Sequence, residues 1–338
     1  MTAPAAFLAA IGAQADALAA GPCFRHDFGI GSAGIRVTVA ARDAGQVIEA
    51  LPETATDAPD WQLAAWDGNE PGRLPPPRPW GDTAHEPLGI VAAFSDETQR
   101  CAYDLHTQSL IVADLAGRRA CTWYPQIATL PAWAKASPFR IPLSWALADR
   151  GLQMVHGAAV SWGGGAALLC GDGGSGKSTT ALAAALAGFG YVGDDYCAVD
   201  SAALQVHMVY RTAKVLPSTL RLLPALGRWI VNPDRMAEEK GVIFLKPGQL
   251  DLVASAPLRC LILPSVADDG VAGLVGATPA EAIHALLPST VGGLMGGTAG
   301  TPSHILRLAR RLPVYRLRLA PDLARVVALL RDAIGEGP

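Results

Sequence analysis

The sequence carries little charge. Only 17% of its 338 residues are Asp, Glu, Lys or Arg, and the formal net charge is −3 at pH 7. This small, nearly balanced charge gives no electrostatic reason to expect a nucleic acid or an anionic membrane surface as a partner. Because half of the residues are hydrophobic, the chain is predicted to be globular rather than disordered. Its length suits about two domains of roughly 150 residues each.

The sequence also lacks paired cysteines and long hydrophobic runs. None of its six cysteines forms a C-x-x-C pair, which argues against a zinc site and a disulfide framework and indicates the reduced thiols of a cytoplasmic protein. No run approaches the roughly 20 apolar residues that a membrane-spanning helix needs. The alanine-rich residues 1–21 lack the basic start of a signal peptide and contain Gln14 and Asp16, so a helix is predicted there.

One stretch carries a specific chemical signal. Residues 171–179 read Gly-Asp-Gly-Gly-Ser-Gly-Lys-Ser-Thr and fit the phosphate-loop pattern G-x-x-x-x-G-K-[ST] at every fixed position. An apolar run at 166–170 precedes the loop and an alanine-rich helical run at 179–187 follows it, which is the required order of strand, loop and helix. Backbone N–H groups of such a loop, together with the helix dipole, bind a polyphosphate. The predicted nucleotide-binding residues here are Gly171, Asp172, Gly173, Gly174, Ser175, Gly176, Lys177, Ser178 and Thr179.

Within this loop, Lys177 is expected to reach the β and γ phosphates, and Ser178 is expected to offer its hydroxyl to Mg²⁺. Arg211 and Lys214 follow a later strand and place two cations near each other, which suits the charge of a transferring phosphoryl group. A surface pair without function is the alternative for these two residues. Two further lysines, Lys240 and Lys246, are weaker candidates.

Two adjacent carboxylates, Asp194 and Asp195, end the predicted strand 189–195. One can hold Mg²⁺ while the other accepts a proton from an attacking hydroxyl. Successive strand side chains point to opposite faces, so both reach one metal only if the backbone turns, and Gly193 makes that turn plausible. His156 lies on the strand before the phosphate loop, from which it can hydrogen-bond a carboxylate. The alternatives are a solvated acidic pair and a core histidine.

The remaining pattern predicts two domains. Residues 1–135 are predicted to form a β-rich domain with an antiparallel meander and an exposed proline-rich loop at 71–79. Residues 136–338 are predicted to form an α/β domain, with a glycine-dense loop at 292–300 that either closes over a substrate or merely connects two helices. The predicted strands are 35–40, 89–94, 101–105, 109–115, 153–162, 165–170, 189–195, 197–199, 205–210, 242–245, 258–263 and 314–319. The predicted helices after residue 136 are 141–150, 179–187, 218–226, 279–287, 303–312 and 322–334.

Three of these motifs together resemble a known family. His156-Gly157, the loop with its Asp172, and Asp194-Asp195 are similar to the catalytic core of the HPr serine kinase/phosphorylase family, whose phosphate-loop fold is related to that of phosphoenolpyruvate carboxykinases. The resemblance covers residues 150–200 well and the following residues loosely. It implies a carboxy-terminal phosphate-loop domain that uses ATP and Mg²⁺. By position it implies that His156 assists Asp194, which activates the target serine, and that Asp195 and Ser178 lie at the magnesium site.

The sequence departs from the family pattern at two points. Thr179 stands where members commonly have Glu, and the downstream glycine-rich segment with a magnesium-binding Glu is not found. The phosphorylase reaction and HPr as substrate are therefore not implied. The chain is more similar to divergent HPr-kinase-like proteins found beside peptide-modification genes, some of which phosphorylate a serine of a ribosomally made peptide such as a lasso-peptide precursor.

The combined prediction is an ATP- and Mg²⁺-dependent kinase that transfers the γ-phosphoryl group to a serine-type hydroxyl of a peptide or protein. Its expected catalytic residues are Asp194, His156 and Lys177, and its expected metal ligands are Ser178 and Asp195. The β-rich domain is a candidate for acceptor recognition, and a homo-oligomer is left open. Two alternatives remain: a non-catalytic nucleotide-binding module, and a carboxykinase-like lyase, which needs a second divalent metal with His and Lys ligands.

Overall fold

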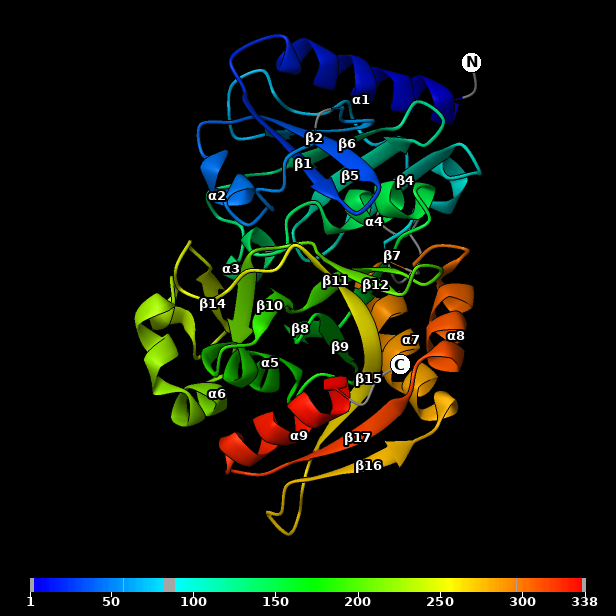
Figure 1. The fold of residues 1–338 in the computed structure, drawn as a ribbon. Helices are drawn as coiled ribbons and strands as arrows, with labels where there is room; N and C mark the ends of the chain where they lie inside the picture. Colours follow the sequence, from blue (N-terminus) through cyan, green and yellow to red (C-terminus); the bar gives the residue numbers. More distant parts are fainter. Residues whose placement is uncertain (1–2, 57, 82–88, 296, 336–338) are drawn as a thin grey trace. The chain divides into compact units, whose positions relative to one another are not determined.

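A computed structural model describes residues 3–56, 58–81, 89–295 and 297–335 of the chain (Figure 1). It is a mixed α/β protein with two main mixed sheets. The chain divides into two compact units, residues 1–150 with 294–296 and residues 151–293 with 297–338. The first unit therefore extends past the predicted boundary at residue 135. The reason is that Asp149 accepts a hydrogen bond from Trp61 Nε1 and pairs with Arg118, both of which belong to the first unit.

The first unit is built on a six-stranded sheet in the order β1-β2-β3-β6-β5-β4. Its strands are β1 (Phe24–Ile30), β2 (Ala33–Ala40), β3 (Trp61–Asp67), β4 (Gln99–Asp104), β5 (Ser109–Asp114) and β6 (Arg119–Tyr124). The central pairs β2–β3 and β3–β6 are parallel, and the other pairs are antiparallel. The predicted meander thus exists only as β4–β5–β6. The predicted strand at 89–94 is wrong, because residues 92–94 form a 3₁₀ turn instead.

Helical segments of the first unit cover this sheet. They are α1 (Ala3–Ala19), α2 (Gly45–Ile48), η1 (Ala92–Phe94), α3 (Ala132–Lys135) and α4 (Arg140–Asp149). The predicted amino-terminal helix is confirmed as α1, which buries Phe7, Leu8 and Ile11 against Trp66 and Phe94. This unit therefore has a hydrophobic core of its own.

The second unit is built on a nine-stranded sheet, with a separate two-stranded sheet of β13 and β14. Its strands are β7 (Gln153–His156), β8 (Ala158–Trp162), β9 (Gly165–Leu169), β10 (Gly190–Gly193), β11 (Tyr196–Asp200), β12 (Gln205–Met208), β13 (Thr212–Val215), β14 (Gly241–Phe244), β15 (Ser255–Val266), β16 (Gly273–Ala277) and β17 (Val314–Leu319). Its helical segments are α5 (Lys177–Leu186), α6 (Pro217–Leu222), η2 (Pro224–Trp229), η3 (Pro233–Arg235), α7 (Pro279–Gly293), α8 (Thr301–Arg311) and α9 (Leu323–Gly335).

Helices cover both faces of this sheet (Figure 1). Along β9, Ala167 and Leu169 join the cluster under α5 and α9, whereas Ala166 and Leu168 join the cluster under α7 and α8. This alternation follows from the two-residue period of a strand, and it explains why the whole of β9 is apolar. Strand β9 is therefore a rigid, doubly covered support for whatever follows its carboxyl end.

Three strands of the sheet end at the same edge. Long β15 runs parallel to β9 on one side and to β17 on the other. Their carboxyl ends therefore lie together, which is where open α/β sheets bind ligands. Within the described residues, no helix combines the length and the apolar character that a bilayer crossing demands.

Two predicted elements are divided in the structure, each for a local reason. The predicted strand 153–162 becomes β7 and β8, because the two parts on either side of Gly157 pair with different strands, β7 with β11 and β8 with β9 and β10. The predicted helix 218–226 becomes α6 and η2, because Pro224 has no N–H group and disfavours a helical Leu223. The predicted loop 292–300 is shorter, since α7 reaches Gly293; its Gly296 lies outside the described residues.

Candidate functional site

The phosphate loop connects β9 to α5, in the order that the sequence predicts. Three of its glycines have positive φ angles: 151° at Gly171, 84° at Gly174 and 101° at Gly176. Residues other than glycine rarely adopt such φ angles, so these three positions require glycine for the loop to close. Gly176 is the N-cap of α5, which places the positive end of the helix dipole at the loop.

Lys177 is the first residue of α5, and its side chain folds back into the loop. Its Nζ donates hydrogen bonds to the carbonyl oxygens of Gly171, at 2.6 Å, and Asp172, at 3.0 Å. Only 7% of the residue is exposed, and burial lowers the pKa of its ammonium. The cation is thus held inside the loop that a polyphosphate would occupy.

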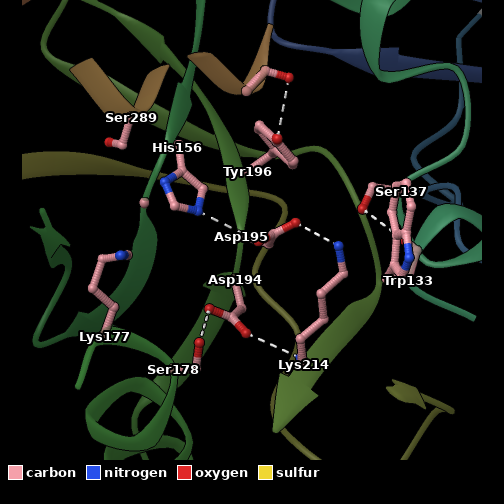
Figure 2. A network of polar contacts seen from close by, with 12 residues as sticks. Trp133, Ser137, His156, Lys177, Ser178, Asp194, Asp195, Tyr196, Lys214 and Ser289 are labelled. Atoms are coloured by element: carbon pink, nitrogen blue, oxygen red, sulfur yellow. Dashed lines mark hydrogen bonds and ion pairs between the residues drawn. The ribbon is translucent and has the colours of Figure 1, made fainter. Parts of the chain in front are cut away.

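One carboxylate lies directly against the loop hydroxyl. Ser178 Oγ donates a hydrogen bond to Asp194 Oδ1 at 2.7 Å, and the backbone N–H of Lys214 donates to Asp194 Oδ2 at 3.1 Å (Figure 2). Asp194 is 2% exposed. Strand β10 therefore delivers Asp194 to the phosphate loop, and strand β13 fixes it from the other side.

The second carboxylate is brought to the same site by an unusual backbone turn. Asp195 has φ 68°, and the N–H of Tyr196 bonds back to the carbonyl of Asp194 at 2.8 Å across it. A three-residue turn with positive φ at a residue that is not glycine is rare and strained. The sequence predicts a turn at Gly193, but the structure places it at Asp195 itself. This turn is what lets both carboxylates reach one site despite their adjacent positions.

Two nitrogen-containing side chains, those of Lys214 and His156, contact the Asp195 carboxylate. Lys214 Nζ lies 2.5 Å from Asp195 Oδ2, and His156 Nε2 lies 3.5 Å from Asp195 Oδ1 (Figure 2). His156 ends β7, where it pairs with Tyr196 of β11, so the strand register itself sets its distance from Asp195. The N–H of His156 also donates to the buried hydroxyl of Thr290 on α7, at 3.1 Å. The histidine is thereby anchored by both backbone and side chain.

The environment separates the two carboxylates in acidity. Burial raises the pKa of Asp194, and the neighbouring charge of Asp195 raises it further. Burial acts in the same direction on Asp195, but the Lys214 ammonium and the His156 hydrogen bond outweigh it and hold the pKa well below the usual range of a carboxyl. Opposite pKa shifts in adjacent carboxylates indicate that the two have different tasks.

These groups line a cavity of about 450 Å³ at the carboxyl edge of the sheet. This volume is within the usual range of a small-molecule pocket. The lining also contains apolar side chains from the ends of β15 and β17, from α6 and from the start of α9. The apolar lining side chains include Leu216, Leu222, Val266, Leu319, Pro321 and Leu323.

Most of the predicted site residues meet at this cavity. Gly173, Gly174, Gly176, Lys177, Ser178 and Thr179 line it, together with His156, Asp194, Asp195 and Lys214. Gly171, Asp172 and Ser175 complete the loop without lining the cavity, and Thr179 also exchanges a hydrogen bond with Thr219 that ties α5 to α6, with the hydroxyl oxygens 2.8 Å apart. Arg211 is not among the lining residues. Lys240, which the sequence ranked low, is one of them.

Two contacts differ from those that the resemblance implied. His156 lies beside Asp195 rather than Asp194, and Ser178 bonds Asp194 rather than Asp195. The difference follows from the left-handed turn at Asp195, which directs its side chain toward β7 while Asp194 stays at the phosphate loop. Strand alternation alone gives no way to foresee this exchange.

No protein-family model matches the chain, and neither does any curated protein. Among solved structures, the chain is similar to the Hpr(Ser) kinase/phosphatase from Coxiella burnetii, with 13% sequence identity and a TM-score of 0.27. The similar region covers 53% of this chain and 95% of that one. This likeness is distant, so a function is inferred below from the side chains of the site.

Proposed function

We propose that the protein is an ATP- and Mg²⁺-dependent kinase that phosphorylates a serine-type hydroxyl of a peptide or protein. The observation that carries this proposal is the Asp195 carboxylate, which contacts His156 and Lys214 in a cavity that the phosphate loop also lines. A phosphate loop alone supports nucleotide binding. A fixed carboxylate beside it adds an acceptor for the proton of an attacking hydroxyl.

The donor set at Ser178 and Asp194 fits Mg²⁺. A hydroxyl and a carboxylate oxygen lie 2.7 Å apart at the start of α5, and hard oxygen donors are what Mg²⁺ binds, usually through few protein ligands plus phosphates and water. Ser178 and Asp194 would hold the ion, which when bound neutralises charge on the β and γ phosphates. The backbone amides of residues 172–178 and the Lys177 ammonium would bind the phosphate oxygens.

Asp195 is then the residue that orients and deprotonates the acceptor. Its low pKa keeps it ionised, so it accepts the hydroxyl proton late, when the γ-phosphorus is already being transferred. His156 fixes one oxygen of Asp195 and Lys214 fixes the other, which sets the direction of the carboxylate. This assignment exchanges the tasks that the resemblance implied for Asp194 and Asp195.

The proposal is tested by incubating the protein with Mg²⁺, γ-labelled ATP and the products of neighbouring genes. We expect label on a serine of one peptide or protein, and loss of that label in Asp195→Asn. ATP binding measured by calorimetry, without transfer to any peptide, protein or small hydroxyl compound, would overturn the kinase proposal in favour of a non-catalytic nucleotide-binding module.

A carboxykinase-like lyase is a second candidate, because one observation favours it. The second metal of such an enzyme needs His and Lys ligands, and His156, Lys214 and Asp195 provide that set of donors in one place. Against it, Lys214 Nζ is paired with the Asp195 carboxylate at 2.5 Å, and a metal ligated by this lysine would have to replace that pairing. Manganese titration separates the candidates: a second Mn²⁺ bound in wild type and lost in Lys214→Met favours the lyase.

A further inference from the structure

Three lysines line the cavity, and they differ in what surrounds their ammonium groups. Lys177 is tied to two carbonyls of the phosphate loop, and Lys214 is paired with Asp195. The third, Lys240, is exposed, and its ammonium has neither a hydrogen bond nor an ion pair within the described parts of the chain. Lys240 is thus the lining lysine whose charge is not yet balanced by the protein.

The backbone on which Lys240 stands is firmly held. Asn232 bridges it on both sides: Nδ2 donates to the carbonyl of Lys240 at 3.0 Å, and Oδ1 accepts from the N–H of Val242 at 2.8 Å. Gly241 next to it packs so closely that a Cβ would lie 3.0 Å from the side chains of Met236 and Val215. The backbone at Lys240 is therefore already in place, and its long cationic side chain can contact a ligand without any rearrangement of that backbone.

The position of Lys240 follows from the two-stranded sheet that also carries Lys214. Strands β13 and β14 pair Val215 with Gly241, and Lys240, which directly precedes Gly241, lines the cavity. Burial is the largest cause of the pKa shifts of Lys177 and Asp194, and the charge of Lys240 is a small further effect that lowers the pKa of both. Lys240 lines the same cavity as these two residues.

We propose that Lys240 is a catalytic residue that binds the γ-phosphoryl group during its transfer. The inference rests on the proposed kinase function. In the transfer step, a bond forms between the acceptor oxygen and the γ-phosphorus, the bond from that phosphorus to the β–γ bridging oxygen breaks, the hydroxyl proton passes to Asp195, and ADP leaves. Lys240 keeps its proton in this step. Its ammonium offsets the negative charge on the equatorial oxygens of the γ-phosphoryl group.

The different surroundings of the three lysines favour this division of tasks. Lys177 belongs to the loop that would bind the nucleotide both before and after transfer. The ammonium of Lys214 forms an ion pair with Asp195. An exposed ammonium in the cavity lining, with no ion pair among the described residues, gains most from a phosphoryl group that is leaving the nucleotide for the acceptor. Because it stabilises the transition state more than bound ATP, Lys240 should affect kcat more than nucleotide affinity.

The test compares Lys240→Ala and Lys240→Arg with a matched control, Lys246→Ala, which removes an exposed lysine after β14 that does not line the cavity. Calorimetry measures the affinity for Mg·ADP alone and with aluminium fluoride, which mimics the transferring phosphoryl group. We expect Mg·ADP affinity to stay within about 3-fold in all variants, because Lys240 contributes little to ground-state binding. Lys240→Ala should lose about 10-fold of the extra affinity gained with aluminium fluoride, and Lys240→Arg should retain most of it.

With an acceptor in hand, kcat should fall about 100-fold in Lys240→Ala and stay unchanged in Lys246→Ala. The proposal is overturned if Lys240→Ala keeps the wild-type gain from aluminium fluoride, or if the variant loses Mg·ADP affinity to the same extent as it loses that gain. Failure of the kinase proposal looks different: the analogue is bound with the expected dependence on Lys240, but no serine-type acceptor is phosphorylated by wild type.

Discussion

The two halves of the site are built in opposite ways. The phosphate-loop half is one contiguous segment, residues 171–179, closed by its own glycines and capped onto α5. The acidic half is assembled from the ends of strands β7, β10 and β13, and its geometry depends on a strained turn at Asp195. A local segment tolerates changes elsewhere in the fold, whereas an assembled one depends on the register of every strand that contributes to it.

This comparison also separates binding from chemistry. In the proposed function, the groups that would hold a polyphosphate are backbone amides, a helix dipole and Lys177, which the loop supplies by itself. The groups that would distinguish a kinase from a nucleotide-binding module are Asp195, His156 and Lys214, and they are brought together from the nine-stranded sheet and the separate β13–β14 pair. Substitutions in the two halves should therefore lower different measured quantities: nucleotide affinity for the phosphate-loop half, and the rate of phosphoryl transfer for the acidic half.

The largest effect is expected from the contiguous half. Lys177→Ala removes the buried cation from the phosphate loop, so both Mg·ATP affinity and transfer should fall, the latter by at least about 10³-fold. Calorimetry and the labelled-transfer assay check the two losses, with Lys246→Ala as the control for removing a lysine. Wild-type ATP affinity in Lys177→Ala would mean that the loop does not hold the phosphates.

The next effect tests how the assembled half divides its tasks. Asp195→Asn should lower kcat about 10³-fold with Mg·ATP affinity nearly unchanged, because it removes the proton acceptor. Asp194→Asn should instead raise the Mg²⁺ concentration needed for half-maximal rate by about 10-fold, because it removes a metal ligand. Titrations of Mg²⁺ with each variant decide the matter. The opposite pattern would restore the division of tasks that the sequence resemblance implied.

The contrast between the halves also explains how far the sequence alone could go. The phosphate loop was predictable because its chemistry depends on residue types at fixed spacing, and the strand, loop and helix order of residues 165–186 is as expected. The pairing of His156 with Asp195 was not, since it depends on the register of β7 against β11 and on a positive φ at a residue other than glycine. Lys240, which lines the cavity, precedes β14, and β14 pairs with β13, a strand that the sequence pattern did not predict.

A smaller effect on stability is expected within the loop itself. Gly176 has φ 101°, and a Cβ there would collide with Leu319 Cδ1, so Gly176→Ala should destabilise the protein by about 2–4 kcal/mol from backbone strain and overpacking. Gly173 has nothing within 4 Å of its would-be Cβ and no left-handed φ, which makes Gly173→Ala the matched control. Denaturant unfolding measures both. Equal stability of the two variants would show that neither the positive φ angle nor the contact with Leu319 costs stability.

The smallest effect concerns how much stability the protein loses by burying Asp194 beside Asp195. The pKa of Asp194 in the folded protein lies above the ordinary value of 3.8, so the folded state binds this proton more tightly than the unfolded state. Ionisation of Asp194 therefore reduces stability as the pH rises above about 3.8. In EDTA, Asp194→Asn should unfold at a higher temperature than wild type at pH 7, and this advantage should shrink as the pH is lowered toward 4. Asp172→Asn controls for the loss of one negative charge at an exposed position of the loop. If Asp194→Asn is no more stable than wild type at pH 7, then the hydrogen bonds from Ser178 and the Lys214 amide already offset the burial of that charge. The buried carboxylate would then not destabilise the folded protein.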